Sequence, residues 1–432
     1  MSTTPSKMMF NVWGICILLW IMLPFNLVDK HLSIVGILAF LFFFFAFLIG
    51  CWSTSIQIVK PQIRRLFISG IKLKNATFIL KLFSAISSLL LFLSLQDRNL
   101  LNLTESYQVR SDQAEALLNG LESASSIFFQ IAFLLYPCGY IYIVLHLIYS
   151  KKISYLSIIV FGFLPIILAM LVMGGRFPIL YAFAIAFFAF RIRKSKAVEL
   201  GHDTSTRRIK IKKKNISIYF LVPIVLLVSL YYFSIVFFVR AESLGGSSVM
   251  FAFAEQVWGV QFNGLLSGFL FSLLGPDGTF LLFIFSWYAI QGFVMTNFIF
   301  TLYDGPLQFG SYGIDIFSAI FRRLSNSFVT DNFSSLLDIG TYGFLPSAFG
   351  SLFVDFGYLG IIVCFIWGRW STLVYMKNKI GDIRSIILMP FMLSGILFSL
   401  INTPFGFTNG FITYLWLFLT YYMIKPYSYK CI

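Results

Sequence analysis

The sequence is poor in charged residues, which make up only 11% of its 432 positions, whereas 59% are hydrophobic. A soluble domain carries about 25% charged residues, so a water-soluble globular protein is excluded. Apolar runs of about 20 residues recur along the chain, and a helix of that length crosses the hydrocarbon core of a bilayer. The sequence therefore predicts an all-α fold: a polytopic helical integral membrane protein with ten to twelve transmembrane helices.

Cysteine and histidine are also scarce. The five cysteines form no Cys-x-x-Cys pair, which argues against a disulfide framework or a zinc site. The three histidines, His31, His146 and His202, all lie outside residues 240–347. The sequence has no P-loop, no dinucleotide fingerprint, no Asp-x-Asp pair and no cluster with metal-ligand spacing. We therefore expect an activity that uses neither a metal ion nor a bound cofactor.

Basic residues give the chain a formal net charge of +15, but they gather in short loops between apolar runs. Such loops face the cytoplasm, so they indicate orientation and not a nucleic-acid-binding surface. Residues 53–75 carry five basic residues and no acid, and the basic loop 191–215 carries ten. Residues 96–125, between these loops, are mainly acidic and are predicted to face outward. The alternation places both termini of this multi-pass protein in the cytoplasm.

The chain 1–432 is predicted to form a single transmembrane domain. Its expected spans are Phe10–Leu27, Leu32–Cys51, Ala76–Leu95, Ile127–Ile148, Ile153–Met173, Phe177–Phe190, Ile216–Val239, Ala348–Trp367, Ile386–Leu400 and Phe411–Ile424. Two further apolar runs, Val249–Leu274 and Thr279–Phe300, are separated by a strong turn sequence at 275–278. The first run also contains four polar residues, Glu255, Gln256, Gln261 and Asn263. The two runs therefore either cross the membrane twice or form re-entrant or interfacial pieces.

Residues 240–347 reverse the charge balance of the chain. They carry seven carboxylates, three arginines and no lysine. The planar guanidinium group of arginine matches phosphate or carboxylate through two parallel hydrogen bonds, and its charge does not titrate away. We therefore predict that 240–347 is an extracytoplasmic or re-entrant functional segment.

Arginines lie beside paired glycines at two predicted outer boundaries. Arg176 follows Gly174-Gly175, and Arg240 shortly precedes Gly245-Gly246. Glycine lets the backbone turn sharply and approach a ligand. The alternative interpretations are a snorkelling side chain for Arg176 and a helix-dipole contact for Arg240.

A second arginine pair, Arg322-Arg323, closes a segment that begins at Phe309. The apolar residues of 309–321 recur at three- and four-residue spacing, which predicts a short amphipathic helix on the membrane surface. Attraction to anionic lipid headgroups would equally explain this pair. Asp355 lies early in a predicted span, where a carboxylate is costly. It is either catalytic, or it neutralises an arginine or caps a broken helix.

Three segments resemble a known family. Gly174-Gly175-Arg176 is similar to the Gly-Ser/Gly-Arg signature of the O-antigen polymerase and ligase group. The stretch from Tyr342 through Asp355-Phe356-Gly357-Tyr358-Leu359-Gly360 resembles the aromatic Asp-Phe-Gly-x-x-Gly block of oligosaccharide repeat-unit (Wzy-type) polymerases, and Phe309-Gly310-Ser311-Tyr312-Gly313 resembles the segment before it. Related ligases carry a histidine in the large outer loop, and its absence here favours a polymerase.

The resemblance implies a multi-pass glycosyltransferase of the bacterial inner (cytoplasmic) membrane. At the outer face of that membrane it would polymerise undecaprenyl-pyrophosphate-linked repeat units into O-antigen or capsular polysaccharide. The resemblance also implies contact with membrane lipids and, as partners, a chain-length regulator and a flippase of the same pathway. Fixed cations would stabilise a pyrophosphate leaving group, and a carboxylate would deprotonate the attacking hydroxyl. The expected substrate-binding residues are Arg176, Arg240, Tyr312, Arg322 and Arg323. The base is expected among Glu242, Asp315 and Asp355.

Two other functions remain open. A flippase for the same lipid-linked unit would place charged residues along a central path and often shows two related halves. A ligase that transfers the finished glycan to a lipid acceptor would share most of the chemistry.

Overall fold

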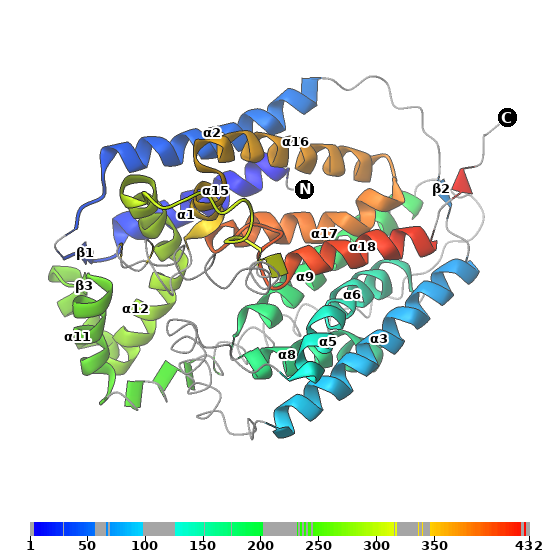
Figure 1. Cartoon of the computed structure of the whole chain (residues 1–432), viewed down its shortest axis with the longest axis horizontal. Coiled ribbons are helices and arrows are strands. Elements are labelled where there is room, and N and C mark those ends of the chain that lie inside the picture. Colours follow the sequence, from blue (N-terminus) through cyan, green and yellow to red (C-terminus); the bar gives the residue numbers. More distant parts are fainter. Residues whose placement is uncertain are drawn as a thin grey trace. The chain divides into compact units, whose positions relative to one another are not determined.

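A computed structural model describes residues 4–28, 30–56, 66–67, 70–97, 126–150, 152–173, 175–201, 231, 234–235, 237–238, 241–242, 245–314, 316–317, 336, 339, 346–424 and 427–428. These residues are almost entirely helical (Figure 1). The longer helices are α1 (Pro5–Met22), α2 (Ile34–Ile56), α3 (Gly70–Asp97), α9 (Phe177–Gly201), α12 (Leu265–Leu302), α16 (Gly360–Lys379), α17 (Ile383–Leu397) and α18 (Gly410–Ile424). The shorter ones are α5 (Ile127–Leu135), α6 (Cys138–Tyr149), α7 (Tyr155–Ile158), α8 (Leu164–Met173), α11 (Ser247–Trp258) and α15 (Ser347–Phe356).

Short antiparallel pairs are the β-structure of the described residues. β1 (Phe25–Leu27) pairs with β3 (Val260–Phe262), and β2 (Leu66–Phe67) pairs with β4 (Tyr427–Ser428). Three short helical segments of other types are Ile159–Phe163 (π-helix), Gly357–Leu359 and Phe398–Leu400 (both 3₁₀). The predicted all-α class is confirmed.

Eight helical stretches within the described ranges are long and apolar enough to cross a membrane. They are Pro5–Met22, Ile34–Thr54, Gly70–Gln96, Ile127–Tyr149, Tyr155–Met173, Leu265–Leu302, Ser347–Lys379 and Ile383–Leu400. These lengths agree with the expectation of a multi-pass membrane protein. Most of the predicted span Ile216–Val239 lies outside the described residues, and the orientation of the loops stays a prediction.

Proline and glycine shift several predicted span ends. The first span, expected over Phe10–Leu27, ends as a helix at Met22, because Pro24 disfavours helical backbone at the residue before it. Residues 25–27 form β1 instead. Similarly, Pro137 separates α5 from α6 within the predicted span Ile127–Ile148.

The sequence leaves two alternatives for the apolar runs 249–274 and 279–300, and the two runs differ from each other in structure. The first forms α11, then β3, then the opening turns of α12, so it is not one continuous helix. At Gly275 the backbone leaves helical geometry, with φ 70° and ψ 177°, and Pro276 starts the second part of α12. From there the helix continues to Leu302. The first run is therefore a broken segment, and the predicted turn at 275–278 appears as the break in α12. The path of both runs through the membrane stays a prediction.

The chain forms two compact units. The first consists of Met1–Gly14, Ser33–Arg193 and Gly292–Ile432, and the second of Ile15–Leu32 and Lys194–Gln291.

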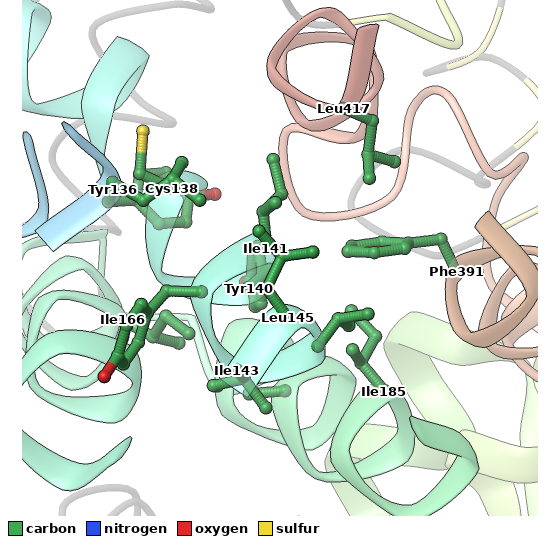
Figure 2. Packing of buried hydrophobic residues seen from close by; sticks show 14 of the residues in the cluster. Tyr136, Cys138, Tyr140, Ile141, Ile143, Leu145, Ile166, Ile185, Phe391 and Leu417 are labelled. Atoms are coloured by element: carbon green, nitrogen blue, oxygen red, sulfur yellow. The ribbon is translucent and has the colours of Figure 1, made fainter. Parts of the chain in front are cut away.

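The core of the first unit is built around α6. Residues 138–145 of this helix are all buried, which is the state of a helix that is apolar on every side (Figure 2). Ile166 of α8, Ile185 of α9, Phe391 of α17 and Leu417 of α18 belong to the same cluster. Gly139 lets α6 approach the π-helical segment closely, since a Cβ there would lie 2.6 Å from the carbonyl oxygen of Gly162. The core therefore requires a small residue at position 139.

Glycines also bring α2 and α16 together in the first unit, where the two helices lie side by side (Figure 1). A Cβ at Gly50 would lie 2.1 Å from the carbonyl oxygen of Phe365, and one at Gly368 would lie 2.0 Å from that of Phe47. The Cys51 thiol donates to the carbonyl oxygen of Gly368 at 3.3 Å. Small residues allow such close backbone approach inside a membrane, where apolar burial drives little helix association.

Replacing Gly368 by alanine is expected to push α2 and α16 apart, because the atom that the new methyl group meets is backbone and cannot rotate away. Overpacking of this kind costs about 1–3 kcal/mol. Thermal unfolding of the purified protein in detergent measures the loss. Gly14→Ala on α1 is the matched control, because a Cβ there meets nothing within 4 Å, and it should leave stability unchanged or raise it slightly. Equal midpoints for the two variants would contradict the close crossing.

Candidate functional site

The carboxylate of Asp355 lies at the centre of a polar cluster in the first unit. It sits near the end of α15 and is only 2% exposed. The backbone N–H of Tyr312 donates to its Oδ1 at 3.0 Å, and that of Gly313 donates to its Oδ2 at 2.9 Å. Both carboxylate oxygens are therefore held by the backbone of one turn. We call this arrangement the Asp355 clamp.

The turn that enters the clamp is also tied to the backbone of α15. The N–H of Gln308 donates to the carbonyl oxygen of Val354 at 3.2 Å, and that of Phe309 donates to the carbonyl oxygen of Asp355 at 2.9 Å. Phe309 has φ 48° and Gly310 has φ 93°, so two successive residues adopt left-handed backbone. For phenylalanine this conformation costs about 1 kcal/mol or more and requires support from its surroundings. The bonds to α15 provide that support.

This turn corrects one prediction from the sequence. The amphipathic helix expected over 309–321 is wrong for 309–313, which form a tight turn. The apolar spacing is misleading for two reasons. Gly310 and Gly313 allow the backbone to adopt non-helical conformations, and Asp355 accepts the two backbone N–H groups that hold the turn. Most of 314–321, including Asp315, lies outside the described residues.

A second loop, residues 401–409 between α17 and α18, closes over the clamp. A Cβ at Gly406 would lie 1.8 Å from the carbonyl oxygen of Gly313, so the two backbones touch. Thr408 and Asn409 have φ 47° and 61°, again left-handed for residues that are not glycine. Such residues are held only where neighbouring structure fixes them. The 401–409 loop is therefore a fixed part of the cluster.

The same loop contacts the start of α9, where Arg176 lies. The ring of Phe407 lies 5.4 Å from that of Phe177 and 5.5 Å from that of Tyr181. The hydroxyl of Tyr136 donates to the carbonyl oxygen of Thr408 at 3.0 Å. Arg176 directly precedes Phe177 and is half-buried. One loop thus joins the α9 start to the Asp355 clamp.

The N-terminus of α15 is fixed by buried hydroxyl groups. Ser347 is fully buried with φ 64°, and its Oγ lies 2.7 Å from Oγ1 of Thr296 on α12. The Ser347 hydroxyl also accepts the N–H of Phe349 at 3.2 Å. Gly292 of α12 allows close packing here, since a Cβ there would lie 2.0 Å from the carbonyl oxygen of Leu400. These contacts fix the helix that carries Asp355.

Burial dominates the electrostatics of the cluster. An ionised carboxylate is costly in such surroundings unless donors surround it, and the two backbone N–H groups fill that need for Asp355. Tyr303, just outside the α12 span, responds to the same surroundings. Its partial burial raises its pKa above the ordinary value, with smaller contributions from the negative charges of Asp355 and Asp304. Its hydroxyl donates to the carbonyl oxygen of Pro306 at 2.7 Å.

Of the predicted site residues, Tyr312 and Asp355 are in direct contact. Arg176 belongs to the same unit, whereas Glu242 is exposed in the other unit. Four predicted site residues lie outside the described residues: Arg240, Asp315, Arg322 and Arg323. Within the described ranges, His, Cys, Asp and Glu side chains form no group of three or more that could hold a metal ion.

Sequence reasoning does not single out the 401–409 loop, although a signal for it exists. The residues Asn402-Thr403-Pro404 and Thr408-Asn409-Gly410 are turn formers between two predicted spans. The intervening residues 405–407 are two phenylalanines and a glycine, which match no recognisable motif. The residues that the loop contacts are therefore evident only in the structure.

Comparisons with known proteins give no relative: no family model, no curated protein and no solved structure matches this chain. The functional argument therefore depends on the residues themselves. Chemically, the cluster offers a rigid turn on a buried carboxylate, with a half-buried arginine at the start of a neighbouring helix.

Proposed function

We propose that the protein is a membrane glycosyltransferase that polymerises undecaprenyl-pyrophosphate-linked repeat units at the outer face of the bacterial inner membrane. The observation that carries this proposal is that the 401–409 loop contacts Phe177, directly after Arg176, and Gly313, in the turn that Asp355 holds, so that it links three segments. They are the Gly-Gly-Arg segment ending at Arg176, the Phe-Gly turn at 309–313 and the Asp-Phe-Gly block that begins at Asp355. These are the segments that resemble the polymerase family. Arg176 lies more than a hundred residues before the turn at 309–313, and Asp355 lies 42 residues after Gly313.

The proposed reaction needs one group that stabilises the leaving diphosphate and another that accepts a proton. The bond between the sugar's anomeric carbon and the phosphate oxygen breaks, and the lipid diphosphate leaves with the electron pair. The acceptor hydroxyl bonds to the anomeric carbon, and its proton passes to a carboxylate. The guanidinium group of Arg176, at the start of α9, suits the developing charge on the diphosphate.

Asp355 has a different part in this proposal. Because both of its oxygens accept backbone N–H groups, it positions the turn that presents Tyr312, whose side chain then faces the substrate in the proposed reaction. The proton acceptor is then Asp315, an acidic residue of the predicted outer segment that closely follows this turn in the sequence.

A direct test uses the purified full-length protein with one defined lipid-linked repeat unit. The expected result is a ladder of products that differ by one repeat unit. Arg176→Ala should lower the rate by about 100- to 1,000-fold, as expected when one donor to a developing oxyanion is removed. Arg191→Ala, an exposed arginine more than three turns further along α9, is the matched control and should keep the ladder. Undiminished ladders from a folded Arg176→Ala variant would remove Arg176 from the mechanism, and no ladder from the wild type would reject the polymerase.

A further inference from the structure

The second unit contains a preformed cavity that the cluster around Asp355 does not include. It has a volume of about 320 Å³ and lies between α11, β3 and the first turns of α12. Small-molecule sites span roughly 300–1,000 Å³, so the cavity is large enough for a small ligand. Three of the polar residues that interrupt the apolar run 249–274, Glu255, Gln261 and Asn263, are among its lining residues. The cavity thus accounts for polar residues that a plain membrane span would not contain.

Aromatic rings form the apolar part of the cavity wall. Phe251, Phe262 and Phe271 come from α11, β3 and α12 respectively. The ring of Phe251 lies 5.4 Å from that of Phe271 and 6.4 Å from that of Phe262, with the second pair stacked. Rings from three elements therefore fix one another. Their faces carry partial negative charge, which suits the polarised C–H groups on one side of a sugar ring.

The polar lining residues are also fixed in place. The amide of Gln261 donates a short hydrogen bond to Oε1 of Glu255. Asn263 accepts the N–H of Gly264 at its Oδ1 at 2.8 Å, while its Nδ2 group can still donate. Ser247 donates to the carboxylate of Asp277, which joins the start of α11 to the second part of α12 beside the cavity. A rigid set of donors and acceptors needs little reordering when a ligand binds.

We propose that this cavity binds one sugar residue of a neutral glycan. A lipid tail would offer no hydrogen bonds to the donors and acceptors of Glu255, Gln261 and Asn263 that these internal bonds leave over, which is costly. A phosphate would meet the carboxylate of Glu255, and none of the lining residues that the structure describes is cationic. A sugar satisfies both halves of the wall, since its hydroxyls pair with Glu255, Gln261 and Asn263 while its C–H face lies on the rings. The choice of glycan as ligand rests on the proposed function, and the site itself is new to it.

The test is saturation-transfer NMR on the full-length protein in lipid nanodiscs. Alkyl-maltoside micelles are unsuitable because their headgroup is itself a sugar. The probes are glucose, galactose, rhamnose and N-acetylglucosamine, with inorganic phosphate as a competitor. We expect saturation to reach the ring protons of at least one sugar, and phosphate not to displace it. No transfer to any of the four sugars, or displacement by phosphate, would overturn the proposal.

Matched variants locate the binding. Phe251→Leu and Gln261→Leu should each weaken sugar binding by about tenfold or more, the effect of losing a ring contact or leaving a polar partner unpaired. The controls are Phe269→Leu on α12 and Gln256→Leu on α11, which change the same residue types in the same unit but away from the lining, and they should bind like the wild type. Thermal unfolding shows whether each variant is folded. If Phe251→Leu does not fold, the sugar affinity of Gln261→Leu decides the test. Wild-type affinity in a folded Gln261→Leu variant would overturn the assignment.

This measurement is independent of the polymerase assay. Sugar binding without a product ladder would reject the proposed function and keep the cavity as a glycan site. A ladder without sugar binding would keep the polymerase and reject the cavity.

Discussion

Replacing Asp355 by alanine is expected to destabilise the protein strongly and to abolish polymerisation. The change leaves the backbone N–H groups of Tyr312 and Gly313 buried without their acceptors. Each such group costs about 1–3 kcal/mol, so the pair costs about 2–6 kcal/mol, a large share of the 5–15 kcal/mol that typically stabilises a protein. Thermal unfolding in detergent and the ladder assay measure the two effects.

Asp355→Asn separates positioning from proton transfer. The asparagine keeps one acceptor oxygen and turns an N–H group toward the second donor, so one backbone N–H loses its partner. Stability should fall by about half as much as for alanine. If Asp355 positions the turn, activity should fall in proportion to the folded fraction. Full stability with no activity would instead indicate that Asp355 accepts the proton.

Asp304→Ala is the matched control for both variants, because this carboxylate is exposed near the start of the same loop. It should keep the wild-type midpoint and the wild-type ladder. A folded Asp355→Ala variant with unchanged stability would show that the clamp does not hold the turn.

The helices could be predicted because membrane crossing depends on local composition. Each predicted span that falls on described residues contains helix, and the largest differences occur where proline or glycine intervenes. Pro24 ends α1 early, Pro137 divides a predicted span, and Gly275 allows the break in α12. These proline and glycine residues can be read from the sequence. The direction in which the chain continues after each break, however, depends on the residues that pack against it.

The candidate site could be predicted only in part. Asp355 was found because a carboxylate is unusual in a span. Its partners are backbone N–H groups more than forty residues away, which carry no side-chain signature. The helical spacing of 309–321 gave the wrong structure for 309–313, because tertiary hydrogen bonds outweigh local apolar periodicity. The 401–409 loop was missed since its role depends on backbone contact at Gly406 and ring contact at Phe407.

Replacing Gly406 by alanine is expected to have the second large effect, because it separates the 401–409 loop from the turn at 309–313. The added methyl group would lie 1.8 Å from the carbonyl oxygen of Gly313, and 2.8 Å from Nδ2 of Asn402. The side chain of Asn402 can move. The carbonyl group of Gly313 is held in place, because the backbone N–H of the same residue donates to Asp355 in the clamp. The loop must therefore shift, at a cost of about 1–3 kcal/mol.

The shift of the 401–409 loop should disturb both ends of the proposed site, the start of α9 and the Asp355 clamp. Phe407 follows Gly406 directly, so its stacking on Phe398, at 4.5 Å, and its contact with Phe177 change together. We expect Gly406→Ala to lose the product ladder while part of the protein still folds, because a cost of about 1–3 kcal/mol is smaller than the 5–15 kcal/mol that typically stabilises a protein. Gly268→Ala is the matched control, since a Cβ there meets nothing within 4 Å. If Gly406→Ala elongates glycans as fast as Gly268→Ala, the loop does not couple Arg176 to the Asp355 clamp, and the convergence that supports the proposed function has no mechanistic role.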